Sequence, residues 1–208
     1  MSKTVAYNID CMEYMKTLPD KAFDLAIVDP PYGIGADNHH GNSSNGWRQW
    51  EKKAWDCKTP KKEYFDELFR VSINQIVWGA NYMTENIPPS MGWVFWDKGQ
   101  RNFSLADGEL AFTSFDRALR VFTYHRAKEL NKKRIHPTQK PVALYEWLLM
   151  NYAKEGDKIL DTHLGSGNSR IAAHKLGFEF VGCELDKDYF EAQEKRFKTE
   201  TMQQNLFV

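Results

Sequence analysis

The chain has 208 residues, which is enough for one domain with a full hydrophobic core and gives no reason to expect two. Its 28 lysines and arginines balance 28 aspartates and glutamates, so net charge alone does not indicate a nucleic-acid partner. The three cysteines have no metal-ligand spacing, no apolar run is long enough for a membrane span, and no signal-like core follows the polar N-terminus. We therefore expect a single cytoplasmic domain over residues 1–208, with no membrane contact and no metal site.

The first third of the sequence predicts a short helix, a buried strand and a long loop. Residues 10–18 suit a helix with Asp10 as its N-cap. Residues 23–28 form an apolar run with one acid that ends abruptly at two prolines, which is typical of a buried strand. Residues 33–60 are mostly irregular and rich in Gly, Asn, Ser and His, so we expect a mobile functional loop there.

The rest of the chain predicts alternating strands and helices. A basic segment spans residues 125–140, and the tail from 200 to 208 is expected to be flexible. Strand, glycine turn, helix, strand and helix follow one another after residue 157, which indicates a parallel sheet with right-handed crossovers. The fold class is therefore α/β, doubly wound. The expected helices are 61–71, 142–153, 168–176 and 186–198, and the expected strands are 73–78, 93–96, 110–115, 119–124, 158–160 and 178–183.

A glycine-containing segment, residues 161–169, lies between a predicted strand and a predicted helix. Glycines there permit positive φ and a close approach of a ligand, and the helix N-terminus offers free N–H groups. Glu184 closes the next strand, where an acid can accept hydrogen bonds from both ribose hydroxyls. The alternatives are a plain helix-capping turn and a dinucleotide site, but a dinucleotide motif expects a third glycine where Arg170 stands. S-adenosylmethionine has no phosphate and needs one close turn, so it fits this pattern better.

The segment Asp29-Pro30-Pro31-Tyr32 directly follows a predicted buried strand. Its prolines fix φ twice and remove two backbone donors, so mostly acceptors face the crevice at the strand end. Two acceptors on the hydrogens of an aromatic amino group would make its nitrogen more tetrahedral and direct its lone pair at an electrophile. Tyr32 could stack on the base, a contact worth about 1–3 kcal/mol. The alternative is a rigid proline turn beside an acid, and the accompanying glycine turn favours the chemical interpretation.

These motifs resemble the beta class of DNA amino-methyltransferases, in which the catalytic motif precedes the cofactor loop. Residues 29–32 resemble the catalytic motif, 136–141 resemble the H-P-T-x-K-P segment, and 161–167 are similar to the D-x-x-x-G-S-G loop. Glu184 matches the ribose-binding acid, and Asp10-Cys11 matches a segment that borders the cofactor's adenine. The matches span nearly the whole chain. One departure is Thr162-His163, where the family often carries Pro-Phe.

The resemblance implies a single seven-stranded, mostly parallel, Rossmann-like methyltransferase sheet with an antiparallel strand, and a target base that is flipped out of the duplex. Aspartate at position 29 favours N6 of adenine, while N4 of cytosine and adenine in structured RNA remain as alternative substrates. The expected catalytic residues are Asp29, Pro30, Pro31 and Tyr32. The residues expected at S-adenosylmethionine are Asp10, Cys11, Asp29, Thr138, Lys140, Asp161, Gly165, Ser166, Gly167, Asn168, Ser169 and Glu184.

Basic residues gather in two segments that are expected to hold double-stranded DNA. Residues 48–62 carry six basic and two acidic side chains, and residues 117–140 carry eight and one. Such clusters suit phosphates, although a solvated surface has the same composition. The tryptophans of the 33–60 loop either close over the flipped base or anchor the loop to the core. The expected DNA contacts are Trp47, Arg48, Trp50, Lys132, Lys133 and Arg134.

Three further expectations concern partners. The resemblance admits a homodimer and a companion restriction nuclease. Gln203, Leu206 and Phe207 resemble a short peptide that docks on the sliding clamp, and a frayed tail is the alternative.

A catalytically silent DNA-binding subunit on the same fold is the non-enzymatic alternative, but such a subunit would not need both Asp29 with Tyr32 and an intact glycine turn.

Overall fold

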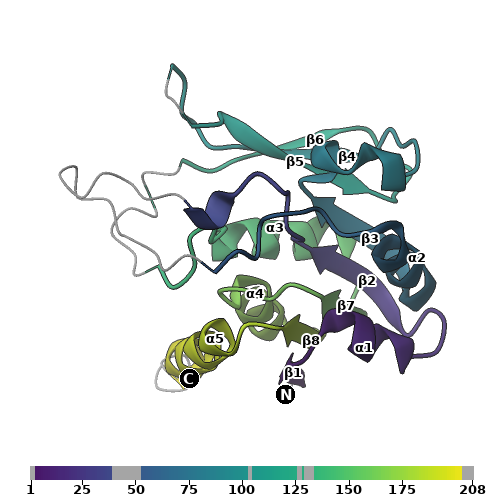
Figure 1. Cartoon of the computed structure of the whole chain (residues 1–208), viewed down its shortest axis with the longest axis vertical. Helices are drawn as coiled ribbons and strands as arrows, with labels where there is room; N and C mark the ends of the chain where they lie inside the picture. The colour runs from purple at the N-terminus through teal and green to yellow at the C-terminus, as the bar shows by residue number, and fades with distance from the viewer. Residues whose placement is uncertain (1–2, 39–52, 103–104, 126–127, 129–133, 203–208) are drawn as a thin grey trace.

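The computed structural model describes residues 3–38, 53–102, 105–125, 128 and 134–202 (Figure 1). These residues form one eight-stranded sheet between helices. No helix among them is long and apolar enough to cross a membrane. The expected DNA contacts Trp47, Arg48, Trp50, Lys132 and Lys133 and the tail residues Gln203, Leu206 and Phe207 lie outside the described residues.

The strands follow the order β1-β8-β7-β2-β3-β5-β4-β6 across the sheet, from β1 near the bottom to β6 at the top of Figure 1. All neighbouring pairs are parallel except those of β5, which runs antiparallel to both β3 and β4. The strand bounds are β1 Thr4–Asn8, β2 Phe23–Val28, β3 Ser72–Trp78, β4 Trp93–Asp97, β5 Gly108–Thr113, β6 Arg120–Thr123, β7 Lys158–Asp161 and β8 Glu179–Glu184.

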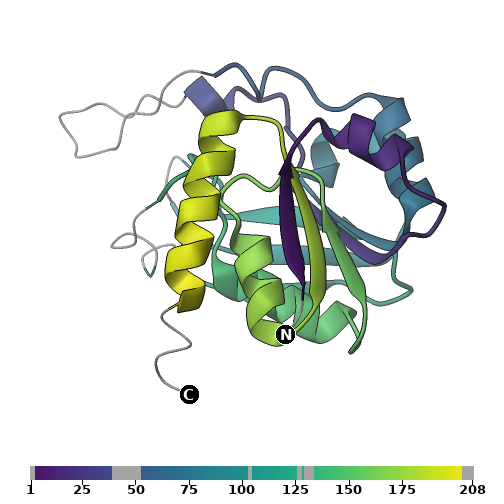
Figure 2. The ribbon, with the colours of Figure 1, turned by 90° about the horizontal axis from the view of Figure 1, so that it is seen from below.

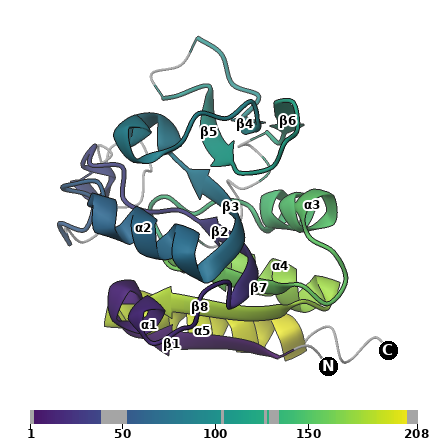
Figure 3. The same cartoon turned by 90° about the vertical axis from the view of Figure 1, so that its right-hand side faces the viewer.

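Helices cover both faces of the sheet (Figure 3). The helices α1 and α2 lie on one face, and α3 and α4 lie on the other. The last helix, α5, packs beside α4 and the edge strand β1 (Figure 2). The helix bounds are α1 Cys11–Lys16, α2 Lys62–Val71, α3 Val142–Tyr152, α4 Asn168–Leu176 and α5 Lys187–Met202, and short 3-10 turns span Ala36–Asn38, Ala80–Tyr82 and Thr84–Asn86.

The side chains of β2 show why the strand is apolar along almost its whole length. Leu25 and Ile27 pack with α3 and α4, while Ala26 and Val28 pack with α1 and α2. A strand alternates its side chains between the two faces, so a central strand covered on both sides must be apolar at nearly every position. Burial of this kind is the main favourable contribution to folding.

The predicted fold class is confirmed, with one difference in strand number. The sheet is mostly parallel with one antiparallel strand, but it has eight strands, where the resemblance implies seven. The sequence interpretation did not identify β1. It is an edge strand of alternating small, apolar and polar residues, half-buried at best, so it lacks the apolar run that marks β2 and β8.

The chain order places a topological switch between β7 and β2. From β2 the chain crosses by α2 to β3 on one side, and from β7 it crosses by α4 to β8 on the other. Ligands of open α/β sheets bind beyond the carboxyl ends of the strands at such a point. Leu160 pairs with Ala26, so Asp161 and Asp29 follow adjacent strands at the same edge.

Candidate active site

Four adjacent parallel strands each have an acidic residue at or just after their carboxyl end, and these four residues form a carboxylate rim. Glu184 and Asp161 are the last residues of β8 and β7, Asp29 follows β2, and Asp10 follows β1 by two positions. Because the four strands are parallel neighbours, all of these side chains belong to one edge of the sheet. The edge is therefore rich in hydrogen-bond acceptors and negative charge.

The corner after β2 is held by a carboxylate that the sequence interpretation did not select. Asp56 is buried, and its Oδ1 accepts the backbone N–H groups of Tyr32 at 2.6 Å and Gly33 at 2.8 Å. Its Oδ2 accepts the N–H of Ala36 at 2.8 Å. Pro30 and Pro31 have no N–H, so Asp56 satisfies the first donors that follow them. The corner is thus fixed by Asp56, which lies near the C-terminal end of the loop that starts at this corner.

The Asp29 carboxylate is bonded through both of its oxygens. Oδ1 accepts the Tyr32 hydroxyl at 2.7 Å, and Oδ2 accepts the Lys140 ammonium at 2.6 Å. Lys140 is buried, with 2% of its side chain exposed, whereas 18% of Asp29 is exposed. The predicted catalytic motif and the predicted H-P-T-x-K-P segment therefore meet at one pair of atoms, although they are more than a hundred residues apart in sequence.

A second carboxylate, Glu109 at the start of β5, completes this charged network. Its Oε2 lies 3.0 Å from the Lys140 ammonium and 3.2 Å from the Tyr32 hydroxyl. Its Oε1 lies 2.6 Å from the ammonium of Lys98, which follows β4. The sequence interpretation missed Glu109 and Lys98. Only the antiparallel position of β5 brings its first residues to the carboxyl edge, and a lone acid in a strand carries no sequence signal.

Burial and charge act together on the ionisation of this network. Burial raises the pKa of Asp29, and the charge of Glu109 adds to that rise against the opposing effect of Lys140. Burial disfavours the charged form of Lys140, but Asp29 and Glu109 outweigh it and raise the pKa of Lys140. Burial likewise opposes ionisation of Glu109, but Lys140 and Lys98 lower its pKa to about 2. Lys140 and Glu109 are therefore charged at neutral pH.

The Tyr32 ring has two close neighbours that sequence reasoning did not identify. Gly79 follows β3 with φ of 66°, and a Cβ there would lie 2.1 Å from the ring, so only glycine fits. Tyr82 stacks on Tyr32 with ring centroids 5.3 Å apart and an interplanar angle of 16°. Tyr82 is 48% exposed. An exposed aromatic ring thus lies against the tyrosine that was expected to stack on a base.

The glycine turn after β7 has the predicted geometry. Gly165 and Gly167 have φ of 50° and 73°, which favours glycine at both positions. The N–H of Gly165 donates to Glu184 Oε2 at 2.7 Å, and Glu184 Oε1 accepts the N–H of Asp186 at 2.9 Å. Burial raises the pKa of Glu184. The turn and the acid at the end of β8 therefore form one unit.

Several side chains of the turn serve its internal structure. Ser169 donates to Asp161 Oδ2 at 2.5 Å, and the N–H of His163 donates to Oδ1 at 3.0 Å. Asn168 is buried and donates to the backbone carbonyl of Lys140, which ties the turn to the segment that contacts Asp29. Ser166 is buried as well. Burial raises the pKa of Asp161 to about 7.

The expected residues at 10, 11 and 138 lie beside these elements. Asp10 caps α1 by accepting the N–H of Met12 at 2.7 Å. Burial raises the pKa of Cys11 to about 12, so its thiol is neutral. The hydroxyl of Thr138 lies 3.1 Å from His136 Nδ1, and burial lowers the pKa of His136 to about 3. The His136 ring packs edge-on against Tyr189, with centroids 4.4 Å apart.

The flank of the long loop reaches the cofactor half of the edge. Lys53 forms ion pairs with Asp186 at 2.9 Å and Asp188 at 2.5 Å, just beyond Glu184. At the other end of the loop, Ala36 is held by Asp56. Of the expected DNA contacts the structure describes Arg134, which is half-buried and donates to the carbonyl of Pro137 at 2.7 Å. The far flank of the loop therefore contacts both predicted half-sites, through Lys53 at Asp186 and Asp188 and through Asp56 at the corner after β2.

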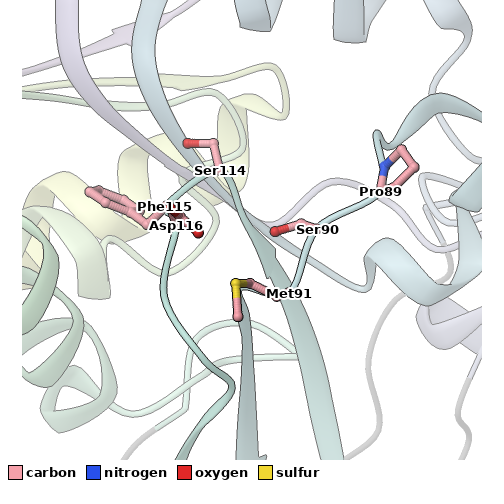
Figure 4. Close-up of a pocket in the computed structure, with 6 residues that line it drawn as sticks. All are labelled: Pro89, Ser90, Met91, Ser114, Phe115 and Asp116. Atoms are coloured by element: carbon pink, nitrogen blue, oxygen red, sulfur yellow. The ribbon is translucent and has the colours of Figure 1, made fainter.

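An open hollow of about 640 Å³ lies at the opposite edge of the sheet (Figure 4). It is lined by residues before β4 and after β5, namely Pro89, Ser90, Met91, Ser114, Phe115 and Asp116. The backbone N–H of Ser114 donates to the carbonyl of Gln75, near the amino end of β3. Asp29 instead follows the carboxyl end of β2, and β2 is parallel to β3. The hollow is therefore not part of the carboxylate rim, which holds the chemically active groups.

The fold and this edge define a class of protein, an open α/β sheet with acidic groups at its topological switch point, where such sheets bind ligands. The family model described as DNA methylase matches residues 58–195, well over half of the chain. The chain belongs to this DNA methylase family. The resemblance inferred from its motifs is thereby confirmed.

Individual relatives agree with this assignment. The chain is 24% identical to the type II methyltransferase M2.DpnII of Streptococcus pneumoniae, over 96% of this chain and 91% of the relative. Its fold is similar to that in the crystal structure of the M1.HpyAVI–SAM complex, with a TM-score of 0.61, 21% identity and coverage of 94% and 98%. It is also similar to PvuII DNA methyltransferase (cytosine-N4-specific), with a TM-score of 0.63, 13% identity and coverage of 95% and 87%.

Proposed function

We propose that this protein transfers a methyl group from S-adenosylmethionine to N6 of adenine in double-stranded DNA, after the base is flipped out of the duplex. The observation that carries the proposal is the meeting of the two predicted half-sites. Asp29 and Asp161 follow adjacent parallel strands, and Lys140 links them by donating to Asp29 while its carbonyl accepts Asn168 of the glycine turn.

The chemistry of the rim supports S-adenosylmethionine as the cofactor. This cofactor carries a sulfonium and an ammonium, and carboxylates at four strand ends favour such positive groups. Glu184 keeps further lone pairs for ribose hydroxyls after it accepts two backbone N–H groups. Asp161 and the turn at Gly165 would lie beside the methionine portion, and Asp10 and Cys11 beside the adenine. The motif of a pyrophosphate site is incomplete here, because Arg170 stands in place of its third glycine and packs on Phe197 of α5, with 3.9 Å to the ring centroid.

When bound, the cofactor supplies an electrophilic methyl group, and transfer forms an N–C bond while the C–S bond breaks and its electron pair stays on sulfur. Asp29 accepts a hydrogen of the amino group and so orients the nitrogen lone pair. The same carboxylate takes the proton that the methylated nitrogen loses. Burial suits it to that role, because a raised pKa makes Asp29 a better base. Tyr32 donates to Asp29 Oδ1 and keeps the carboxylate oriented.

Adenine N6 is proposed over cytosine N4 because the catalytic motif begins with aspartate. The family includes enzymes of both specificities, and a cytosine-N4-specific enzyme shares the fold. No described contact reads the ring of the base. The assignment of the base therefore rests on the motif and needs a direct test.

DNA would be held by the loop at 33–60, with Trp47, Arg48 and Trp50, and by the basic segment at 125–140, with Lys132, Lys133 and Arg134. The anchored far flank of the loop supports this role, because Asp56 holds it at the corner after β2 and Lys53 pairs with Asp186 beyond Glu184. We propose that the enzyme acts in the cytoplasm as part of a restriction-modification system. A homodimer and the clamp contact through Gln203, Leu206 and Phe207 stay predictions.

The test is expression in a host without adenine methylation, followed by single-molecule sequencing of its DNA. The expected result is N6-methyladenine at one recurring sequence, and its absence from cells that express the Asp29→Ala variant. N4-methylcytosine at a recurring sequence would contradict the choice of base. Unmodified DNA in the presence of soluble, cofactor-binding protein would favour a silent DNA-binding subunit.

A further inference from the structure

Both oxygens of Asp29 are occupied by donors of the chain itself. The Tyr32 hydroxyl lies 2.7 Å from Oδ1, and the Lys140 ammonium lies 2.6 Å from Oδ2. A substrate amino group needs an acceptor at this carboxylate, so it competes with these two donors. Lys140 is the stronger competitor, because it is a charged donor in a buried place.

The same two donors share a second acceptor. Glu109 Oε2 lies 3.0 Å from the Lys140 ammonium and 3.2 Å from the Tyr32 hydroxyl. Each donor that occupies Asp29 can therefore move to Glu109 by a small displacement, without losing its hydrogen bond. One carboxylate oxygen has enough lone pairs to accept both.

Glu109 is held in place from the side opposite Asp29. Its Oε1 pairs with Lys98 at 2.6 Å, and both side chains are largely buried, with 22% and 16% exposed. Glu109 lies in β5 opposite Trp96 of β4, so the sheet fixes its backbone. The Lys98 ammonium also lies 5.0 Å from the centroid of the Trp96 ring. These contacts keep Oε2 directed at Lys140.

We propose that Glu109 is a positioning residue, which takes over the Lys140 ammonium and the Tyr32 hydroxyl when Asp29 turns to the amino group of the substrate, with Lys98 holding Glu109 in place. This inference rests on the proposed function and names a residue that the family motifs do not include. Without Glu109, release of Asp29 would leave the buried Lys140 ammonium without a carboxylate partner, which is strongly unfavourable.

The two pairs also keep the charge of the site balanced. The two carboxyl groups, of Asp29 and Glu109, lie against two amino groups, of Lys140 and Lys98. A cationic cofactor held at the carboxylate rim would add positive charge to the site. Movement of Lys140 towards Glu109 would separate the ammonium from that charge, so cofactor and base would both favour the exchange.

The test is the variant Glu109→Gln in single-turnover methylation of duplex DNA, measured over a range of pH. Glutamine keeps the shape but removes the charge, so Lys140 stays on Asp29 and the rate should fall by roughly tenfold, equivalent to about 1.4 kcal/mol. The affinities for DNA and cofactor should stay unchanged. The charge of Glu109 helps to raise the pKa of Asp29, so its removal should lower that pKa. The acid limb of the pH–rate profile should therefore move to lower pH.

Two further variants complete the experiment. Lys98→Met removes the ammonium that holds Glu109 and should also slow the reaction. This variant tests the inference if Glu109→Gln does not fold. Glu146→Gln is the matched control, because Glu146 pairs with Lys175 at 3.1 Å between α3 and α4, away from the rim, and its rate should equal that of the wild type.

Three results would overturn the inference: a wild-type rate and pH profile for Glu109→Gln, a slower rate with an unmoved acid limb, or an equal loss in Glu146→Gln. The wild-type protein is measured first on the same DNA. If the wild type leaves adenine unmethylated, the proposed function fails, and that outcome is distinct from a failure of the role of Glu109 in an active enzyme.

Discussion

Asp161 keeps its proton to higher pH than an ordinary aspartate, because burial raises its pKa to about 7 against the opposing hydrogen bonds from Ser169 and His163. A cationic ligand at the rim favours the ionised carboxylate. Binding of the cofactor would therefore release a proton from Asp161 in the neutral range. The two equilibria are linked through this one residue.

The affinity for S-adenosylmethionine should consequently fall as the pH is lowered from about 8 to about 6. Below its raised pKa Asp161 is protonated in the free protein, so ionising it costs part of the binding free energy. Calorimetry in buffers of different ionisation enthalpy would measure both the affinity and the proton release. Asp161→Asn should bind more weakly and show a flatter pH profile, and an unchanged slope in that variant would contradict this role.

Tyr82 offers a second test at the scale of one side chain. Its exposed ring stacks on Tyr32, the ring proposed to stack on the base, so removing it should weaken the hold on a flipped base by up to the roughly 1–3 kcal/mol that such stacking contributes. Tyr82→Ala should reduce the fluorescence of 2-aminopurine at the target position, while Tyr82→Phe retains it. Tyr7 of the edge strand β1 is a matched control, because it is 43% exposed and its ring packs against Tyr14 of α1. Equal signals for Tyr82→Ala and Tyr7→Ala would refute the prediction.

At the scale of elements, the catalytic corner depends on a loop flank that bends back to it. Asp56 accepts three backbone N–H groups between Tyr32 and Ala36. Among the described residues all of these donors are backbone groups, so the Asp56 carboxylate orders the path of the chain itself. The end of β2 and the loop flank that carries Asp56 therefore form one structural unit.

Replacing Asp56 with asparagine should lower the free energy of unfolding by about 1–3 kcal/mol. The side-chain NH2 of asparagine is itself a donor, so it would face backbone N–H groups without accepting their hydrogen bonds. Urea denaturation would measure this loss. Asp66→Asn is the control, since it breaks only the exposed pair with Lys62 in α2 and should cost about 0.3–0.5 kcal/mol. Similar midpoints for the two variants would show that the corner does not depend on Asp56.

The elements that carry strong local patterns could be predicted from the sequence. The helix Asn168–Leu176 begins and ends as expected, because a glycine turn precedes it and Gly177 closes it. The strand β1 was missed, because it is a half-exposed edge without an apolar run. Glu109, Lys98 and Asp56 were missed for a different reason. Their role depends on which strands and loops meet in space, and neither the antiparallel position of β5 nor the return of the loop is written in local sequence.

For the whole molecule, the strand order explains why motifs more than a hundred residues apart form one site. Along the chain, β2 is followed by its neighbour β3, and much later β7 pairs with the other side of β2. Half of the rim therefore comes from the first thirty residues and half from the last fifty. The antiparallel β5 and its partner β4 extend the same edge with Glu109 and Lys98.

Ligand binding should stabilise the whole fold selectively. A saturating ligand at a hundred times its Kd adds about 2.7 kcal/mol to the free energy of unfolding. S-adenosylmethionine should therefore raise the melting temperature, whereas NAD at the same concentration should not. A larger shift with NAD would identify a dinucleotide site and contradict the interpretation of the glycine turn.

The most direct test of the central claim, that the acceptor corner and the cofactor turn form one active site, is transfer of an isotope-labelled methyl group. Purified protein would be incubated with unmethylated duplex DNA and methyl-labelled S-adenosylmethionine, and the nucleosides would be separated by mass spectrometry. The account predicts label in N6-methyldeoxyadenosine, lost in Asp29→Ala with cofactor binding intact. Label in another nucleoside, or equal labelling by Asp29→Ala, would contradict it.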